Sequence, residues 1–226
     1  MKINNIHLEW KIKESKKVIR ATHKRWSKTA GVAFTGRKDS TVLMHLILDV
    51  TKGGLPAMFI DHGLHFDETI ENLEILEKLW KLKIIRVTDK DLMKKLTDTK
   101  NKRSKVKIVT QLKIQVIRNT IKEQKWKALY TAIRWDEQYS RRNEVYISKR
   151  LDHFRIHPIL HWTEKDIWDY IRMNNIPYIS LYDEGYRSIG ERIFTKKSSE
   201  YSIGERSGRD KDKEIVMDRL RKLGYF

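Results

Sequence analysis

Residues 34–41 combine the residue types that hold a phosphate group. An apolar run at 31–34 precedes them and a longer one at 42–48 follows, which predicts a strand, a turn and a helix. The first amide groups of such a helix have no partner within it and attract an anion. Gly36 allows close backbone approach, Lys38 adds a charge and Ser40 a hydroxyl. The segment predicts a phosphate site, although the spacing of a Walker loop is absent.

A plain helix start explains the same residues without a ligand. Asp39 or Ser40 could cap the helix, because short polar side chains accept hydrogen bonds from its first amide groups. The segment alone does not decide between a phosphate site and a capped helix, so later segments of the chain have to be weighed with it.

The octet resembles the PP-loop, Ser-Gly-Gly-x-Asp-Ser, of ATP pyrophosphatases and sulfonucleotide enzymes. Thr35 replaces the serine of that pattern, and Arg37 replaces its second glycine. The resemblance implies that the nucleotide is bound by Thr35, Gly36, Arg37, Lys38, Asp39 and Ser40.

A second candidate segment, 61–69, follows the apolar run at 57–60 and reads DHGLHFDET. It resembles the Asp-Thr-Gly-x-x-Phe-x-Glu-Thr segment of phosphoadenylyl-sulfate (PAPS) reductases and of the ATP sulfurylase small subunit. The resemblance implies that Asp61 and Gly63 contact the nucleotide. Asp61 would hold Mg²⁺ or a ribose hydroxyl, and Asp39 would orient the loop or assist the metal. Asp67 or Glu68 could serve as a helix cap. For His62 and His65, surface or capping roles stand beside metal ligation.

Arginines follow a further apolar run, at 128–133. The same family places Gly-x-Arg-x-x-Glu-x-x-x-Arg here, and this chain has Arg134, Glu137 and Arg141 at the charged positions. Arginine forks onto phosphate or sulfate, so the resemblance implies catalytic roles for Arg134 and Arg141 together with Lys38. A structural ion pair between Glu137 and a neighbouring arginine is the alternative.

Two more segments extend the resemblance over about residues 8–226. Residues 157–168 read HPILHWTEKDIW and match a family segment that we interpret as a capped helix with aromatic packing. The segment 205–209 and the last residues, 223–226, resemble the ends of the sulfurylase small subunit. If this tail only docks on the domain, replacing Glu205 should leave the nucleotide site intact.

The chain has no cysteine. Disulfides, thiolate metal sites, iron–sulfur clusters and reactions through a protein thiol are therefore excluded. Where related sequences carry cysteines, this chain has Val109, Glu191 and Phe194. A reductase of this family needs a thiolate that attacks the sulfonucleotide, so the chain cannot run that reaction unaided.

Apolar periodicity predicts the elements that position these residues. Strands are expected at 31–35, 57–60, 83–87, 128–133 and 154–156. Helices are expected at 7–27, 39–52, 66–79, 109–121, from 163, and at 211–223. Residues 88–107 are interpreted as a mobile loop and 180–210 as irregular. Strand–helix alternation predicts a doubly wound, mainly parallel sheet, and the resemblance implies the adenine-nucleotide α-hydrolase type. We expect a nucleotide-binding domain at 1–180, with helix 7–27 packed on it, and an extension at 181–226.

Composition indicates which classes of partner the chain can bind. The 226 residues carry a formal charge of +18, which favours nucleotides, sulfate, nucleic acid or an acidic protein. No apolar run approaches the roughly 18 residues that span a bilayer, and the Lys-rich start lacks a signal peptide's apolar core, so a cytoplasmic protein is expected.

The leading hypothesis is adenylyl transfer from ATP to sulfate with release of pyrophosphate, as in the ATP sulfurylase small subunit. The resemblance implies Mg²⁺ and a GTPase large subunit as partner; a homo-oligomer is also open. Three alternatives remain: a PAPS- or adenylyl-sulfate-binding relative that borrows a thiol, an enzyme that adenylates RNA or another acceptor, and a nucleotide-binding subunit without chemistry of its own.

Overall fold

The computed structural model describes residues 6–199 and 204–222. Six strands form one sheet in the order β3-β2-β1-β4-β6-β5. Their bounds are β1 Ala30–Ala33, β2 Ala57–Ile60, β3 Ile84–Val87, β4 Ala128–Tyr130, β5 Ile147–Lys149 and β6 Phe154–Ile156. Every pairing is parallel except that of β5 with β6.

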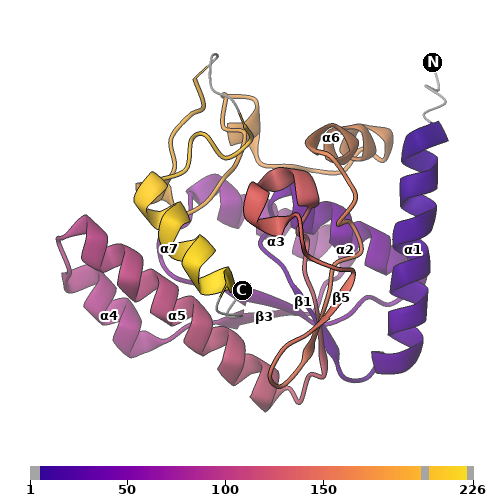
Figure 1. Ribbon diagram of the computed structural model, residues 1–226, viewed down its shortest axis with the longest axis horizontal. Coiled ribbons are helices and arrows are strands. Elements are labelled where there is room, and N and C mark those ends of the chain that lie inside the picture. The colour runs from indigo at the N-terminus through magenta and orange to yellow at the C-terminus, as the bar shows by residue number, and fades with distance from the viewer. Residues whose placement is uncertain (1–5, 200–203, 223–226) are drawn as a thin grey trace.

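Helices cover both faces of this sheet (Figure 1). Their bounds are α1 Ile6–Trp26, α2 Lys38–Thr51, α3 Asp67–Trp80, α4 Lys90–Asp98, α5 Lys102–Glu123, α6 Glu164–Met173 and α7 Lys211–Lys222. Apolar side chains of α1, α2, α3 and α6 pack against one face, whereas α5 packs against the other face with α4 beside it. The predicted doubly wound α/β fold is confirmed.

The order of the strands places the phosphate loop. From β1 the chain moves outward through β2 to β3, and then returns to pair β4 on the other side of β1. The direction of winding therefore reverses between β1 and β4, and ligands of such sheets bind beyond the carboxyl ends of the strands at this point. The loop at 34–37 follows β1, and the arginine segment follows β4.

Buried polar contacts, as well as apolar ones, join helix α1 to helix α6 and the residues that precede it. Lys11 of α1 pairs with Asp166 of α6 at 2.5 Å, and both residues are buried. Ser15 accepts from the indole of Trp162 at 2.9 Å. The expected capping box is present, because Thr163 accepts from the Asp166 amide and the Asp166 carboxylate accepts from the Thr163 amide. This part of the family-like segment is architectural.

The prediction of a mobile loop at 88–107 was wrong. The segment holds α4 and the start of α5, with Asp89 and Asn101 as N-caps. Leu92 and Leu96 lie four residues apart on α4 and are buried against α5. Leu92, Met93 and Leu96 are the apolar residues of a nine-residue helix whose other positions are polar or charged, so composition obscured the helical period.

Smaller differences concern the sheet edge and the tail. Strand β5 was not predicted, because only three residues of alternating burial pair with β6. Strand β4 ends at Tyr130, earlier than expected. Residues 180–199 and 204–210 are irregular apart from short 3₁₀ turns, as predicted for these parts of the segment 180–210, whose residues 200–203 lie outside the described residues. Residues 223–226 lie outside the described residues, and the division at 180/181 stays a prediction.

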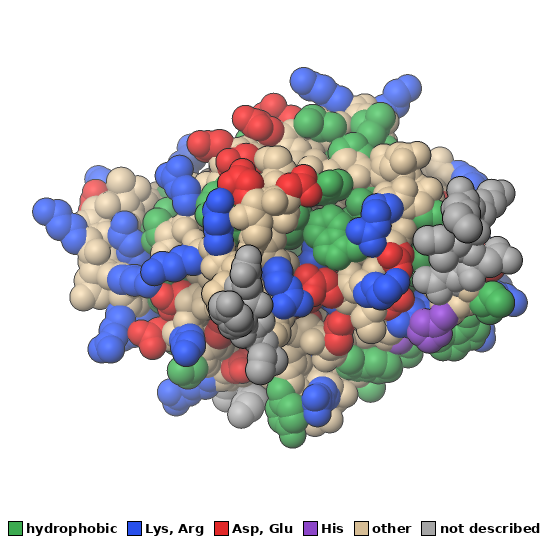
Figure 2. Space-filling model, turned by 90° about the horizontal axis from the view of Figure 1, so that it is seen from above, with side chains coloured by type: hydrophobic (Ala, Val, Ile, Leu, Met, Phe, Trp, Pro, Cys, Tyr) green, Lys and Arg blue, Asp and Glu red, His purple; other side chains and the backbone are tan. Residues whose placement is uncertain are grey.

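No described helix has both the length and the apolar character that crossing a membrane requires. On the face shown in Figure 2, Lys and Arg side chains are intermingled with Asp and Glu. The expectation of a nucleic-acid partner therefore continues to rest on the net charge of +18.

Candidate nucleotide site

The loop after β1 brings its hydroxyls together beneath the start of α2. Thr35 Oγ1 lies 2.9 Å from Ser40 Oγ, and the Thr35 amide donates to the same oxygen at 3.3 Å. Gly36 has φ +67, a left-handed conformation that favours glycine, and its carbonyl accepts from Asn72 at 2.8 Å. These contacts position the loop at the first turn of α2. There the Lys38 amide donates to the Tyr182 hydroxyl at 3.3 Å, and the next amides have no partner within the helix and can attract an anion.

Arg37 takes the place of the family's second glycine without backbone strain. Its φ is −92, which any residue adopts, and its side chain donates to the Gly190 carbonyl at 3.0 Å. Arg37 is also the N-cap of α2, with no side-chain cap. The alternative in which Asp39 or Ser40 caps the helix is therefore wrong: Asp39 binds cations, and Ser40 donates to the Arg37 carbonyl at 2.9 Å.

Lys38 and Arg134 converge on one carboxylate, that of Glu205. The Lys38 ammonium pairs with Glu205 and lies 3.3 Å from Asp39. The Arg134 guanidinium donates to Glu205, to Asp39 at 2.7 Å and to Asp136 at 2.6 Å. Both cations are fully buried, and Glu205 is 7% exposed. Groups from the ends of β1 and β4 thus form a two-cation site that holds an anionic group.

Buried cations keep their charge here because carboxylates surround them. Burial alone lowers the pKa of Lys38, but Asp39 and Glu205 outweigh it and the pKa is raised. Arg134 behaves in the same way, with Asp39 and Glu205 as the main opposing groups. For Glu205, burial and the nearby Asp39 raise the pKa. Lys38 and Arg134 therefore stay protonated, and because Asp39, Asp136 and Glu205 already balance their charge, an incoming anion must compete with these carboxylates.

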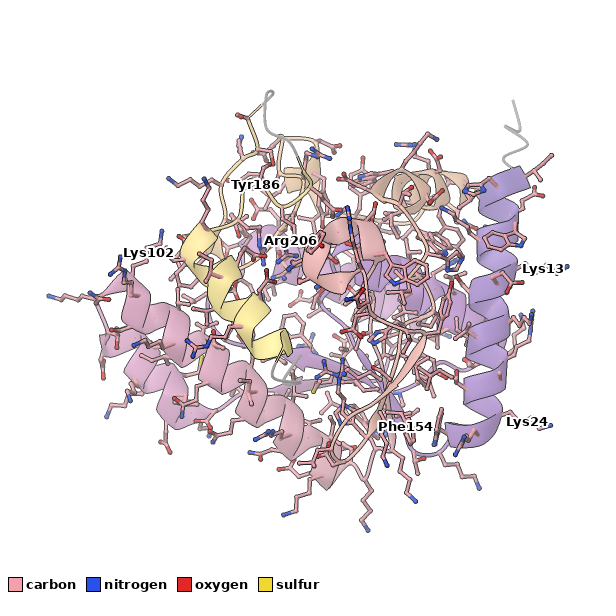
Figure 3. All side chains as sticks on the ribbon, viewed as in Figure 1. Lys13, Lys24, Lys102, Phe154, Tyr186 and Arg206 are labelled. Atoms are coloured by element: carbon pink, nitrogen blue, oxygen red, sulfur yellow. The ribbon has the colours of Figure 1, made fainter. Side chains whose placement is uncertain are left out.

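Arg141, the third predicted catalytic residue, does not bind Glu205 or Asp39 but belongs to a neighbouring group of ion pairs. It pairs with Glu137, which also accepts from Arg206 at 2.5 Å. Arg206 in turn forks onto Glu214 of α7 with two contacts of 2.8 Å. Figure 3 shows Arg206 between the start of α7 and the turns that follow β4. Glu137 thus forms ion pairs with Arg141 and Arg206, as the structural alternative expects, and a catalytic role of Arg141 stays a prediction.

The tail is fixed to the site by backbone contacts. Lys196 donates to the Gly208 carbonyl at 2.8 Å, and Asp210 donates to the Phe194 carbonyl at 3.0 Å. A Cβ at Gly208 would lie 2.2 Å from the carbonyl oxygen of Lys196, so only glycine fits. This pairing delivers Glu205 to Lys38 and Arg134, and the expectation that Glu205 lies apart from the nucleotide site was wrong.

The segment after β2 forms a separate group of contacts. Asp61 accepts from the Gly63 amide at 2.9 Å, and Gly63 has φ +64. His62 and His65 are buried and stacked at 3.8 Å, not surface residues. Burial is the main reason that the pKa of His65 is lowered to about 4.

The first-turn acids of α3 do not cap that helix. Its N-cap is Phe66, without a side-chain hydrogen bond, so Asp67 and Glu68 only add negative charge to the first turn.

The aspartates expected to hold Mg²⁺ have different partners. Asp39 binds Lys38 and Arg134, whereas Asp61 accepts from Gly63. Within 6–199 and 204–222, no group of three or more His, Asp or Glu side chains is arranged to hold a metal. These residues do not fit a protein-held Mg²⁺ site, so no chemical step is assigned to a metal here.

The positions that carry cysteines in related sequences do lie together. Val109 and Phe194 share one apolar cluster. Glu191 is fully buried and pairs with Lys113 of α5 and Lys213 of α7. Apolar contact and ion pairs thus join α5, α7 and the segment at 190–195 where a thiol would otherwise lie.

The sequence of this chain matches a family model, the phosphoadenosine phosphosulfate reductase domain, over residues 29–197. This match covers most of the chain and includes the phosphate loop and the arginine segment. The chain belongs to the phosphoadenosine phosphosulfate reductase domain family.

Relatives include reductases. Adenosine 5′-phosphosulfate reductase 2 of Bacillus subtilis is 30% identical, over 76% of this chain and 74% of that protein. An uncharacterized protein of Methanocaldococcus jannaschii is 29% identical over 76% of this chain, but the match spans only 37% of that longer protein. The activity of a relative is therefore not transferred to this chain by similarity alone.

Solved structures share the fold at low identity. FMN adenylyltransferase of Candida glabrata, in complex with FAD and inorganic pyrophosphate, has a TM-score of 0.68 at 20% identity, covering 97% of this chain and 85% of that one. The PAPS reductase of Candida auris, a phosphate complex, has a TM-score of 0.67 at 19% identity, covering 84% of this chain and 97% of that one. The fold is thus shared by a protein named as a reductase and by a protein named as an adenylyltransferase.

Several charged residues of this family member were not predicted as part of the site. Glu205 and Arg206 come from a segment far from the phosphate loop in sequence. The closely spaced arginines of the tail were the available sequence signal. The structure shows that backbone hydrogen bonds of 194–196 with 208–210 bring this part of the tail to the residues that follow β1 and β4.

Proposed function

We propose that the chain binds the phosphates of an adenine nucleotide at the loop 35–40 and transfers its adenylyl group to sulfate. The observation that carries the proposal is the convergence of buried Lys38 and Arg134 on one carboxylate beyond β1 and β4, in a chain without cysteine. Such a site neutralises and positions anions and contains no sulfur nucleophile. The remaining site assignments, Thr35 to Ser40 with Asp61, Gly63 and Arg141, are part of this proposal.

Adenylyl transfer suits these groups because the protein itself forms no covalent bond. A sulfate oxygen attacks the α-phosphorus of ATP, the bond to the bridging oxygen breaks, and pyrophosphate leaves with the electron pair. Holding the two anions in line and balancing their charge supplies the catalysis. In this proposal the Lys38 side chain and the following amides of the first turn of α2 bind the phosphates, and Arg134 binds them from the β4 side.

Exchange of labelled pyrophosphate into ATP tests the proposal. Because sulfate activation is unfavourable, and because the chain resembles the sulfurylase small subunit, the assay uses a complex with a cognate GTPase large subunit, saturating Mg²⁺ and sulfate. We expect exchange that depends on sulfate and that Arg134→Ala abolishes. The matched control is Arg187→Ala, whose guanidinium pairs with Glu164 on the surface. Background exchange in a demonstrated complex would contradict sulfate transfer.

A second function is favoured by the names of the relatives. Adenosine 5′-phosphosulfate reductases match this chain at 30% identity, so binding of adenylyl sulfate or PAPS with a thiol supplied by another protein is the competing proposal. Sulfite release that requires an added thiol protein, together with absent pyrophosphate exchange, would favour it.

A further inference from the structure

Helix α5 carries charges of a single sign over almost its whole length. Its 22 residues include seven Lys and Arg residues, and its one acidic residue is Glu123 at the end. Every other described α-helix has at least two acidic residues among its basic ones. The surface of α5 therefore differs from the mixed face in Figure 2 and does not simply reflect the net charge of the chain.

The outward side of α5 forms a row of polar and basic side chains. Residues three or four positions apart share one side of a helix. The exposed residues between 103 and 122 carry cationic, amide or hydroxyl groups without exception: Arg103, Ser104, Lys107, Gln111, Gln115, Arg118, Asn119 and Lys122. At about 1.5 Å per residue the row is about 28 Å long. Figure 3 shows α5 beside α4 at one end of the molecule, with Lys102 at the start of α5.

Lysines of this row have no carboxylate partner inside the protein. Lys107 and Lys122 are exposed, and neither forms an ion pair with any residue of 6–199 or 204–222. The same is true of Lys100, which is exposed and precedes the N-cap of α5. Arg103 has only a contact of 3.8 Å with Asp212, and both side chains are largely exposed. These cations are available to an anionic partner.

The charges at the start of α5 do not stabilise the helix. Its first turn contains Lys102 and Arg103 and no acidic residue, although the helix dipole favours acidic residues at this end. The pair of Lys102 with Asp210, at 2.5 Å, offsets part of this cost. Sequence choices that work against local stability are expected where a surface serves a function.

The composition of the row matches a double-helical nucleic acid. Lys, Arg, Asn, Gln and Ser side chains are among those that contact phosphate and sugar in protein–DNA complexes. Proteins that hold single strands add aromatic side chains on which bases stack, and residues 90–123 include no aromatic residue. Duplex DNA carries one charge per about 1.7 Å of its axis, about twice the density of one strand, so a row of cations gains most from a duplex.

We propose that the exposed row of α5 binds the phosphate backbone of duplex DNA, without selecting a base sequence. Lys100, Lys107 and Lys122 contact the phosphates, and the amide side chains between them donate to the same backbone. The proposal goes beyond adenylyl transfer and uses neither Lys38 nor Arg134.

Fluorescence anisotropy with a labelled duplex tests the proposal on the full-length protein. We expect binding that weakens as salt rises, with a slope of log K against log[salt] of about −0.9 per phosphate contacted. The triple variant Lys100→Gln/Lys107→Gln/Lys122→Gln should reduce the steepness of this slope by about 2 to 3 and weaken binding by about tenfold or more at about 0.1 M salt.

The matched control removes the same charge from another helix. Lys13→Gln/Lys17→Gln/Lys24→Gln replaces three exposed lysines of α1 and should weaken binding by less than about threefold. Lys107→Gln alone should reduce the steepness of the slope by about 0.9, so the test does not depend on the folding of the triple variant.

Three results would overturn the proposal. Duplex binding that is absent at low salt would exclude a DNA-binding surface. Equal weakening by the α1 and α5 triple variants would assign binding to net charge alone. Tighter binding of single-stranded RNA or of polyglutamate than of the duplex would assign the row to another class of polymer. Pyrophosphate exchange is measured without DNA, so failure of this proposal and failure of adenylyl transfer are distinguishable.

Discussion

Replacing Glu205 by glutamine should tighten nucleotide binding while it destabilises the unliganded protein. The Glu205 carboxylate pairs with Lys38 and Arg134, the two cations proposed to hold nucleotide phosphates. A phosphate that uses both cations must approach that carboxylate or displace it. Glutamine keeps the shape of the side chain and removes its charge, so the substitution isolates the competition between the two anions.

The size of the effect follows from the geometry. Two unit charges about 5 Å apart repel by about 3 kcal/mol at an effective dielectric constant of about 20. Movement of the tail and partial solvation reduce this, so we expect a gain of about 1–2 kcal/mol, or about 5- to 30-fold in the affinity for ATP. Breaking the buried pairs should lower the free energy of unfolding by about 3 kcal/mol, because Asp39 remains as partner of both cations.

Calorimetric titration of ATP and chemical unfolding measure the two effects. The matched control is Glu184→Gln, whose carboxylate pairs with Lys197 at 3.1 Å on the surface and should change neither quantity by more than about 1 kcal/mol. If folded Glu205→Gln binds ATP tenfold more weakly than the wild type, Glu205 holds the cations in position for the nucleotide and the competition reasoning is refuted.

Three further outcomes are expected. Supplied with thioredoxin or glutathione, the purified chain should not reduce PAPS, because it has no cysteine; sulfite well above the protein-free control would contradict this. Asp166→Ala should cost about 3–5 kcal/mol in chemical unfolding because it leaves Lys11 buried and unpaired, whereas Asp169→Ala, at surface pairs of the same helix, should cost under about 1 kcal/mol; equal losses would refute this. Unfolded histidine takes up a proton as the pH falls below about 6.5, whereas buried His157, with its pKa lowered to about 3, does not. The free energy of unfolding should therefore fall between pH 7 and 5, by up to about 1.4 kcal/mol per pH unit for this residue, and an unchanged slope in folded His157→Gln would exclude this cause.

The sequence predicts the central part of the fold because its pattern there is local. Short apolar runs before Thr35, Asp61 and Arg134 are strands, and each is followed by polar residues at the carboxyl edge of the sheet. The elements missed are those whose pattern is weak, namely α4 with its two buried leucines and the three-residue edge strand β5.

The site was less predictable because its partners are distant in sequence. Lys38 and Arg134 were predicted from their positions after two strands, but their shared partner Glu205 lies 71 or more residues away from either. The segment that meets Lys38 and Arg134 is placed by 190–199 and 204–210, which are irregular. Local periodicity does not predict where Glu205 lies in the fold. The hydrogen bond from the Lys196 amide to the Gly208 carbonyl helps to fix its position.

Calorimetric titration of ATP into the folded Lys38→Ala/Ser40→Ala double variant tests nucleotide binding at the phosphate loop most directly. Each side chain is expected to contribute about 1.5–3 kcal/mol, the range for hydrogen bonds to charged groups. The double variant should therefore bind ATP at least about 100-fold more weakly than the wild type, with thermal unfolding showing that it is folded. An unchanged affinity would place the nucleotide elsewhere and would contradict both the site and the reaction proposed for it.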